Sequence, residues 1–519
     1  MTASPGIHTE PQAAGITTRV VRGSLWSIGG QGVVIAASLV ATPFVIRLLG
    51  TESYGVLALI NVLIGYLAFA DLGMGAASTR FGSQAHARGD DEEEASVVWT
   101  ALALSFIPSM VAALALALAA RPLVEHALRL PDHLQGVAVI ALRIAAVGFV
   151  ARAVSGVLNT PQLTRLRMDL YTLINSGSAV LQVALVPTVL ALGGGLVAAV
   201  SVIAGICVGV VLAHSIVSAK LVPGLIRPRL NAGLIRPFFS FGGALVVSYV
   251  ASATLMNMEK FLLPRYASVT ALAHYSVAYT FASLLAVAPI AIGQSLFPAF
   301  SRLQAGADRE PLKRLYERVL RGCLICLGPT ALIMTVTARP FFTIWAGSEY
   351  GRESAFPFYI LLVGLIFNVL AYIPSTLLVA FDKHRITARF NLIQLLPYGL
   401  FAGVLVYRFG AVGAAAAWSL RLLLDALFLF FMASRVARFS FWPFSGGWRS
   451  YPTAIAVLLV PVPLVLSEMA SPVILFVIAA VSLSAYGTMI WRYVLTAEER
   501  AWVWEQFNWS LRGLVARKA

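Results

Sequence analysis

Long apolar runs alternate with short polar connections along almost the whole chain. Each run has about 20 residues, the length that an α-helix needs to cross a bilayer. Most runs are apolar on every face, unlike the single apolar stripe of a helix on a soluble core. The predicted fold class is therefore all-α, a polytopic membrane protein. The pattern predicts about 14 transmembrane helices, at residues 25–46, 54–78, 97–120, 135–158, 171–193, 195–219, 238–263, 271–297, 323–345, 355–381, 386–407, 412–434, 452–469 and 471–493.

Composition and charge agree with a membrane protein. Of the 519 residues, 59% are hydrophobic and 12% are charged, whereas soluble domains carry about 25% charged residues. The formal net charge is +15, but the basic residues lie mainly in the connections between apolar runs. We therefore assign them to membrane topology and not to nucleic-acid binding. With the N-terminus inside, the inner connections hold about 27 Lys and Arg and the outer ones about 7, which predicts that both termini are cytoplasmic.

Two similar turns indicate an internal duplication. Residues 47–55 and residues 265–275 each begin with an Arg and each join two long apolar runs. A repeat with a spacing of about 220 residues predicts two pseudo-symmetric six-helix bundles, followed by two extra C-terminal helices. The predicted divisions are a disordered cytoplasmic tail, an N-terminal lobe, a C-terminal lobe, helices 13 and 14, and an amphipathic cytoplasmic tail, at residues 1–18, 19–225, 226–440, 441–495 and 496–519.

Three polar stretches lie outside the apolar runs. The acidic run at residues 90–94 is predicted to be a solvated loop. Residues 308–321 have one apolar and one basic face, which predicts a separate helix on the membrane surface, and the C-terminal tail has the same character. The three cysteines include one Cys-x-x-Cys pair inside an apolar run, so we expect packing and no metal, redox site or cofactor.

Function is expected at polar residues inside the apolar runs, because such residues are costly in a bilayer. Lys260 and Asn257 share one helix face, and Lys260 either anchors an anionic substrate or pairs with a nearby acid. Arg421 and Asp425 form either a buried ion pair or part of a cavity. The predicted substrate-binding residues are Lys260, Asn257, Arg143, Arg421 and Gln294, and the predicted coupling or cavity acids are Asp71, Glu259 and Asp425. Arg143 is preferred to Arg152, which lies near enough to a helix end to reach water.

Five motifs carry a resemblance to a known family. They are Arg47-Leu-Leu-Gly-Thr-Glu-Ser-Tyr-Gly, Asp71-Leu-Gly-Met-Gly, Glu259-Lys260-Phe-Leu-Leu, His274-Tyr275-Ser-Val-Ala-Tyr279 and Leu296-Phe-Pro-Ala-Phe-Ser-Arg302-Leu. In this order the chain resembles the polysaccharide transporter family, flippases for O-antigen- and capsule-type lipid-linked oligosaccharides. That family belongs to a superfamily that also holds the lipid II flippase and the multidrug and toxin extrusion (MATE) antiporters. The chain departs from the family's usual turn at residues 267–270 and in having helices 13 and 14.

The resemblance implies a fold, a substrate and partners. The fold is two six-helix lobes around a central cavity lined by helices 1, 2, 7 and 8. The substrate is a polyprenyl-diphosphate-linked oligosaccharide, moved to the outer leaflet of the bacterial cytoplasmic membrane by alternating access. Intramembrane cations suit the diphosphate, and amides and hydroxyls suit the sugars. Membrane lipids and a polysaccharide polymerase complex are the expected partners. No direct use of ATP is expected, because no Walker A pattern is present. The alternative of a membrane enzyme, such as a polyprenyl-dependent glycosyltransferase or ligase, would need a large polar catalytic loop, and the outer connections are short and lack a paired-carboxylate or His constellation. No enzymatic activity is therefore expected. A lipid II-type flippase and a MATE-like cation-coupled drug antiporter remain alternatives.

Overall fold

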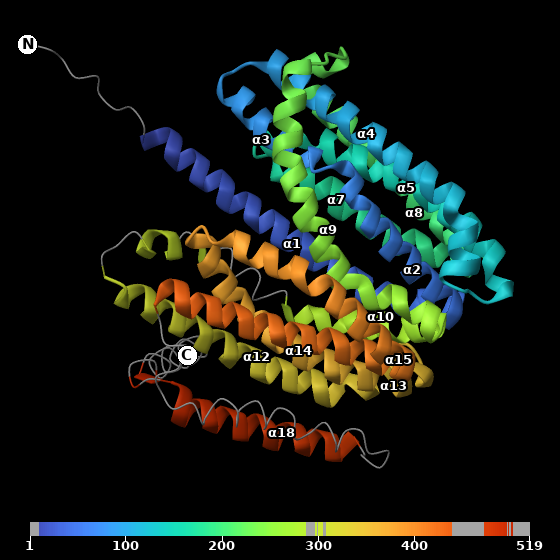
Figure 1. The fold of residues 1–519 in the computed structure, drawn as a ribbon, viewed down its shortest axis with the longest axis vertical. Helices are drawn as coiled ribbons and strands as arrows, with labels where there is room; N and C mark the ends of the chain where they lie inside the picture. The colour runs from blue at the N-terminus through green and yellow to red at the C-terminus, as the bar shows by residue number, and fades with distance from the viewer. Residues whose placement is uncertain are drawn as a thin grey trace, which may run out of the picture. The chain divides into compact units, whose positions relative to one another are not determined.

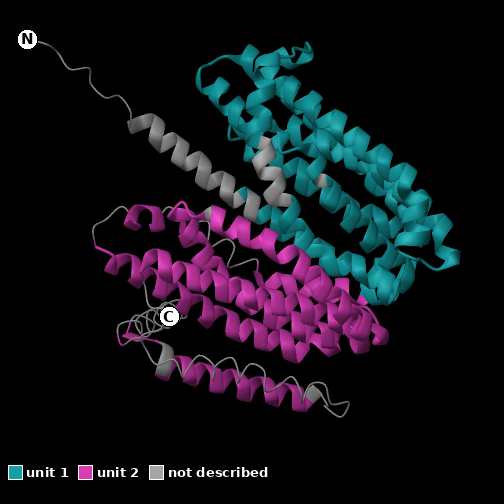
Figure 2. Cartoon of the chain, in the orientation of Figure 1, with its two compact units in different colours: residues 1–273 teal, residues 274–519 magenta. Residues whose placement is uncertain are grey.

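The structure consists of helices. The computed structural model describes residues 10–286, 296–297, 299–304, 308–438, 472–495, 497 and 500–501. Every regular element in these ranges is helical (Figure 1). Within the described residues, eleven stretches are long and apolar enough to cross a membrane, which confirms the prediction of an all-α polytopic membrane protein. The chain divides into two compact units, residues 1–273 and 274–519, which are described separately here (Figure 2).

Unit 1 is a bundle of long helices around small apolar side chains. Its elements are α1 (Glu10–Leu49), α2 (Thr51–Leu67), η1 (Ala68–Asp71), α3 (Met74–Ala87), α4 (Asp91–Pro122), η2 (Leu123–Ala127), α5 (Asp132–Leu158), α6 (Thr160–Thr164), α7 (Met168–Ala191), α8 (Leu196–Leu221), η3 (Pro223–Ile226), η4 (Ala232–Leu234), α9 (Ile235–Tyr266) and the start of α10 (Val269–Ser283). Helices α4, α5 and α8 run side by side, and α1 packs on α7 (Figure 1). One core cluster joins α3, α4 and α9 through the buried Met74, Val98 and Phe238.

Unit 2 has its own core, rich in aromatic side chains. Its elements after the remainder of α10 are η5 (Leu284–Ala286), α12 (Glu310–Trp345), α13 (Ser348–Glu353), α14 (Ala355–Ala380), α15 (His384–Ala437), α18 (Pro472–Met489) and η6 (Ile490–Val494). Phe281, Phe342 and Phe358 pack edge to face or tilted, with ring centroids 5.5–5.6 Å apart. Helix α18 is fastened to α12 because the Tyr486 hydroxyl donates to the Leu324 carbonyl at 2.6 Å.

The number of membrane helices agrees with the predicted pattern as far as the structure describes the chain. Helix α15 contains non-helical backbone at Gly410 (φ 54°, ψ −129°), so it is two arms of membrane length joined at a kink. Counting both arms and α9 gives thirteen membrane-length helices in the described residues. The remaining predicted segment, 452–469, lies outside them. A helix count near 14 is therefore compatible with the structure.

Three local predictions were wrong. The second predicted helix is not continuous, because α2 ends at Leu67 and a tight turn precedes α3 at Met74. Residues 310–321 are not a separate surface helix, because no break separates them from the apolar remainder of α12 and their Leu312 and Leu320 are fully buried. The acidic run is not a loop beyond Asp90, because residues 91–94 form the first turn of α4. Four acidic side chains suit a helix N-terminus, where the helix dipole is positive.

The division of the chain into two six-helix lobes stays a prediction. Along the chain, the boundary between the compact units falls between residues 273 and 274, whereas the boundary between the predicted lobes falls between 225 and 226. Helix α9 belongs to unit 1, and α1 begins at Glu10, inside the stretch predicted as a tail. The apolar pattern marks only the membrane-embedded part of a helix, so it does not report such extensions. Residues 439–471 and most of the C-terminal tail lie outside the described residues.

Gly55 generates a prediction about packing at one end of the bundle. A Cβ on Gly55 of α2 would lie 2.3 Å from the carbonyl oxygen of Val269, so even Ala forces the two backbones apart. We expect Gly55→Ala to lower the free energy of unfolding by about 1–3 kcal/mol. Gly65 on the same helix has no atom within 4 Å of such a Cβ, and Gly65→Ala should be neutral or stabilising by up to about 1 kcal/mol. Thermal unfolding in detergent measures both, and equal melting temperatures for the two variants would contradict the close contact.

Candidate functional site

Asp71 sits at the break between α2 and α3. Leu72 and Gly73 both adopt left-handed backbone, with φ 54° and φ 70°, which turns the chain after η1. The Asp71 carboxylate accepts from the backbone N–H of Gly75 at 3.3 Å with one oxygen and from the Ser105 hydroxyl of α4 with the other. The break leaves the Gly75 N–H, at the start of α3, in need of an acceptor, and the Asp71 carboxylate provides one. Asp71 thus fastens the start of α3 to α4, and its predicted role as a coupling acid stays a prediction.

Lys260 and Asn257 are brought together on α9, as their spacing predicted. The Lys260 Nζ donates to the Asn257 Oδ1 at 2.9 Å, and the Asn257 Nδ2 donates to the Ala253 carbonyl at 3.1 Å. Lys260 is only 8% exposed, and Glu259 is fully buried beside it. A buried ammonium, a buried carboxylate and a partly buried carboxamide thus lie within two turns of one helix. Low local dielectric strengthens every charge interaction there.

Helix α9 is held against α2 next to these residues. The Tyr66 hydroxyl of α2 donates to the Thr254 carbonyl at 3.2 Å, and the Tyr66 ring meets Phe261 edge to face at 4.7 Å. Further along α9, Arg265 Nη1 donates to the carbonyl oxygens of His126 and Ala127 at 3.0 and 2.8 Å. These contacts fix the rotation of α9 and with it the direction of the Lys260 side chain within unit 1.

Arg421 and Asp425 form the intrahelical ion pair that was one of the two interpretations. The Arg421 Nη1 donates to Asp425 Oδ2 at 2.8 Å, and Gln394 Nε2, on the other arm of α15, donates to Asp425 Oδ1 at 2.7 Å. The guanidinium also lies over the Tyr398 ring, 5.4 Å from its centroid. The group is buried, with Arg421 7% exposed, so this pair joins the two arms of α15. A cavity role for either residue stays a prediction.

The remaining predicted residues lie apart from these clusters. Arg143 is exposed on α5, and its Nε donates to the Ala117 carbonyl of α4 at 3.2 Å. It lines an apolar groove of unit 1, so the structure does not bring it to Lys260. Gln294 lies outside the described residues. Their assignment to substrate binding remains a prediction.

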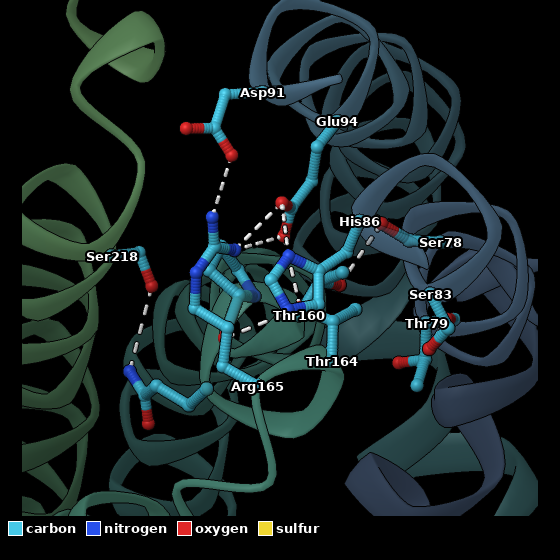
Figure 3. Close-up of polar contacts among 12 residues, drawn as sticks. Ser78, Thr79, Ser83, His86, Asp91, Glu94, Thr160, Thr164, Arg165 and Ser218 are labelled. Atoms are coloured by element: carbon cyan, nitrogen blue, oxygen red, sulfur yellow. Dashed lines mark hydrogen bonds and ion pairs between the residues drawn. The ribbon is translucent and has the colours of Figure 1, made fainter. Parts of the chain in front are cut away.

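A buried charge cluster at the start of α4 was missed in the sequence (Figure 3). Glu94 is fully buried, and both of its oxygens accept from Arg165 Nη1 at 2.5 and 2.6 Å. Thr164 donates to the same carboxylate at 2.9 Å, and Arg165 Nη2 donates to Asp91 at 2.9 Å. The cluster fastens the α3–α4 turn to the segment that follows α6. No sequence signal separates Glu94 from the exposed acids beside it, because its partner lies about 70 residues away.

The charge cluster around Glu94 is not arranged as a metal site. His86, Asp91 and Glu94 place potential ligand atoms within 4.8 Å of one another. However, Arg165 binds both oxygens of Glu94 and one of Asp91, so a guanidinium already occupies the place where a cation would be bound (Figure 3). The arrangement is one guanidinium held between two carboxylates, with Nη1 on Glu94 and Nη2 on Asp91, which balances the charges within the protein.

The comparison with known protein families identifies the chain. A family model described as "Polysaccharide biosynthesis protein" matches residues 44–355, more than half of the chain. The chain belongs to the polysaccharide biosynthesis protein family. The matched part of the chain contains Asp71, Asn257 and Lys260, whereas Arg421 and Asp425 lie beyond it. The resemblance inferred from motif order is thereby confirmed.

Individual proteins extend the comparison beyond the family model. The chain is 26% identical over 424 residues to the "Putative O-antigen transporter" of Shigella flexneri, and the match covers 80% of this chain and 98% of that protein. Among solved structures, the lipid II flippase MurJ in an inward closed conformation is similar with a TM-score of 0.67 and 13% identity, over 91% of this chain and 99% of that one. An inward-facing multidrug transporter of the MATE family is similar with a TM-score of 0.65 and 15% identity, over 78% of this chain and 95% of that one. At 13–15% identity, these two similarities show that the chain shares the fold of both proteins and nothing more.

The buried pair of Glu94 and Arg165 generates a stability prediction. Glu94→Gln removes the charge that compensates a guanidinium with only 14% of its side chain exposed, and we expect a loss of about 3 kcal/mol. The neighbouring Glu93 pairs with Arg88 at an exposed site, so Glu93→Gln should cost less than about 1 kcal/mol. Thermal unfolding in detergent compares the two variants. If Glu94→Gln loses no more stability than Glu93→Gln, the buried Glu94–Arg165 pair does not stabilise the fold and the prediction is wrong.

Proposed function

We propose that this protein is a flippase that moves a polyprenyl-diphosphate-linked oligosaccharide from the cytoplasmic to the outer leaflet by alternating access. The observation that carries the proposal is the similarity to the Shigella flexneri protein over almost that protein's whole length. The fold does not choose among substrates, because a lipid II flippase and a MATE transporter both share it. The family match favours a lipid-linked glycan over a cationic drug.

Lys260 is the proposed anchor for the diphosphate. Its ammonium and the Asn257 carboxamide lie 2.9 Å apart, which places a cation for phosphate beside donor and acceptor groups for sugar hydroxyls. Its burial lowers competition from water for the same charge. Arg421 and Gln294 are further proposed substrate contacts, although Asp425 compensates the charge of Arg421. Asp71, Glu259 and Asp425 are the proposed coupling acids.

The proposed translocation needs no chemical change in the substrate. Moving an anion outward across a membrane that is negative inside is favoured by about 2.3 kcal/mol per charge for each 100 mV. The diphosphate thus contributes a driving force that an ion gradient supplements. A polymerase complex that consumes the translocated repeat units is the proposed partner, and the bilayer receives the polyprenyl chain.

Substitution of Lys260 tests the anchoring role. Lys260→Ala should reduce glycan export at least about tenfold, because a charge-assisted hydrogen bond of about 1.5–3 kcal/mol is lost, while Lys260→Arg should keep part of it. Lys220, exposed at the end of α8, provides the control Lys220→Ala, which should export normally. Surface glycan and cytoplasmic lipid-linked units are measured in a strain that depends on this protein, with membrane-inserted protein quantified. Normal export by Lys260→Ala, or a loss explained by protein amount alone, would contradict the role.

The proposed location is the bacterial cytoplasmic membrane, with both termini in the cytoplasm. The excess of Lys and Arg in alternate connections supports this orientation. A C-terminal alkaline phosphatase fusion, which is active only outside the cytoplasm, should therefore be inactive, whereas a C-terminal fluorescent protein should be bright. The same phosphatase inserted after Gly50, in the first outer turn, is the positive control. Phosphatase activity at the C-terminus would overturn the orientation.

A further inference from the structure

One face of unit 1 has the character of a surface in contact with lipid. Helices α4, α5 and α8 pack side by side (Figure 1). Each exposes large apolar side chains along its length, among them Met110, Leu114, Ile140, Val147, Val208 and Leu212. Contiguous apolar exposure on this scale is found where a protein meets hydrocarbon or a partner. Because the three helices are also long enough to cross a bilayer, hydrocarbon is the natural neighbour of this face.

A groove runs along this face between the three helices. It has a volume of about 490 Å³ and is lined by residues such as Phe106, Met110, Val150, Val154 and Val211. Arg143 is the one charged or hydrogen-bonding side chain among the residues that line it. The groove therefore offers an apolar channel with a guanidinium on its wall.

The position of Arg143 explains which ligand group it needs. Counted from Asp132 at the start of α5, Arg143 lies about 16 Å along the helix. Its Nε donates to the Ala117 carbonyl of α4, the helix that precedes α5. One carbonyl dipole does not balance a guanidinium next to hydrocarbon, where a cation is costly. The Nη groups thus favour an anion beside the groove.

We propose that this groove binds an anionic phospholipid from the leaflet at the Asp132 end, with its phosphate on the Arg143 guanidinium and an acyl chain along the apolar lining. In the orientation proposed above, this is the outer leaflet. The single positive charge of the groove matches the single negative charge of a phosphodiester. The lining has no amide, hydroxyl or carboxylate side chain to bind sugars, and a diphosphate carries more charge than one guanidinium balances. Both facts favour a phospholipid over the lipid-linked glycan.

The test compares lipid binding to purified variants by native mass spectrometry. The probes are phosphatidylglycerol, zwitterionic phosphatidylcholine and undecaprenyl diphosphate. Wild-type protein should retain phosphatidylglycerol in preference to phosphatidylcholine. Arg143→Met should reduce this preference about fivefold, the factor that one basic residue contributes to binding of anionic lipid. Arg152→Met is the matched control, because Arg152 is also exposed on α5 but does not line the groove.

A second variant separates the groove from surface charge in general. Val150→Trp keeps Arg143 and fills the apolar channel, so it should also lower retention of phosphatidylglycerol. An unchanged lipid preference in Arg143→Met, or an equal loss in Arg152→Met, overturns the proposal. Loss of undecaprenyl diphosphate alone in Arg143→Met also overturns it and assigns the groove to the substrate. Lipid retention is measured without transport, so this result is independent of the export assay for Lys260.

Discussion

A peptide group inside hydrocarbon has no water to bind, so every backbone N–H and C=O must find a partner within the protein. This constraint accounts for the all-helical architecture and also for the way its interruptions are built. Where α2 gives way to α3, the Leu72 N–H bonds to the Phe69 carbonyl at 2.9 Å. Asp71 then accepts from Gly75 and Ser105. A carboxylate at a helix break is thus first a structural acceptor, whatever further role it has.

The same constraint governs the charges that lie among the apolar helices. Arg165 meets Glu94, and Arg421 meets Asp425, each with a short contact and further hydrogen bonds around the carboxylate. Lys260 contacts an amide instead and lies beside a buried acid. In the two Arg–carboxylate pairs the charges are balanced within the protein, and the hydrogen bonds around each carboxylate hold separate segments together. The Asn257 amide places a donor and an acceptor beside the Lys260 ammonium, and the proposed function places the substrate anchor there.

Arg143 belongs to neither kind. It lies on an apolar face, and its Nε donates to the carbonyl oxygen of Ala117. Its position inside a predicted membrane helix made Arg143 resemble the other intramembrane cations. The structure shows instead that it lines a groove of valines and large apolar side chains. The fold therefore separates two chemistries that look alike in the sequence. One cation sits within the packed helices, and one sits where the protein meets the bilayer.

The sequence by itself determined the all-α class, the approximate places of the helices, the Lys260–Asn257 face and the family. All of these depend on periodicity or on neighbours a few residues apart. Only the tertiary structure decided that Glu94 is buried, because its partner Arg165 comes from another helix connection. It also brought Gln394, from the other arm of α15, to the ion pair of Arg421 and Asp425. The break at residues 68–73 was likewise hidden, because Asp71 stabilises it through Ser105 on α4. Local spacing encodes which face a residue shares, but burial and charge balance depend on distant segments that only folding brings together.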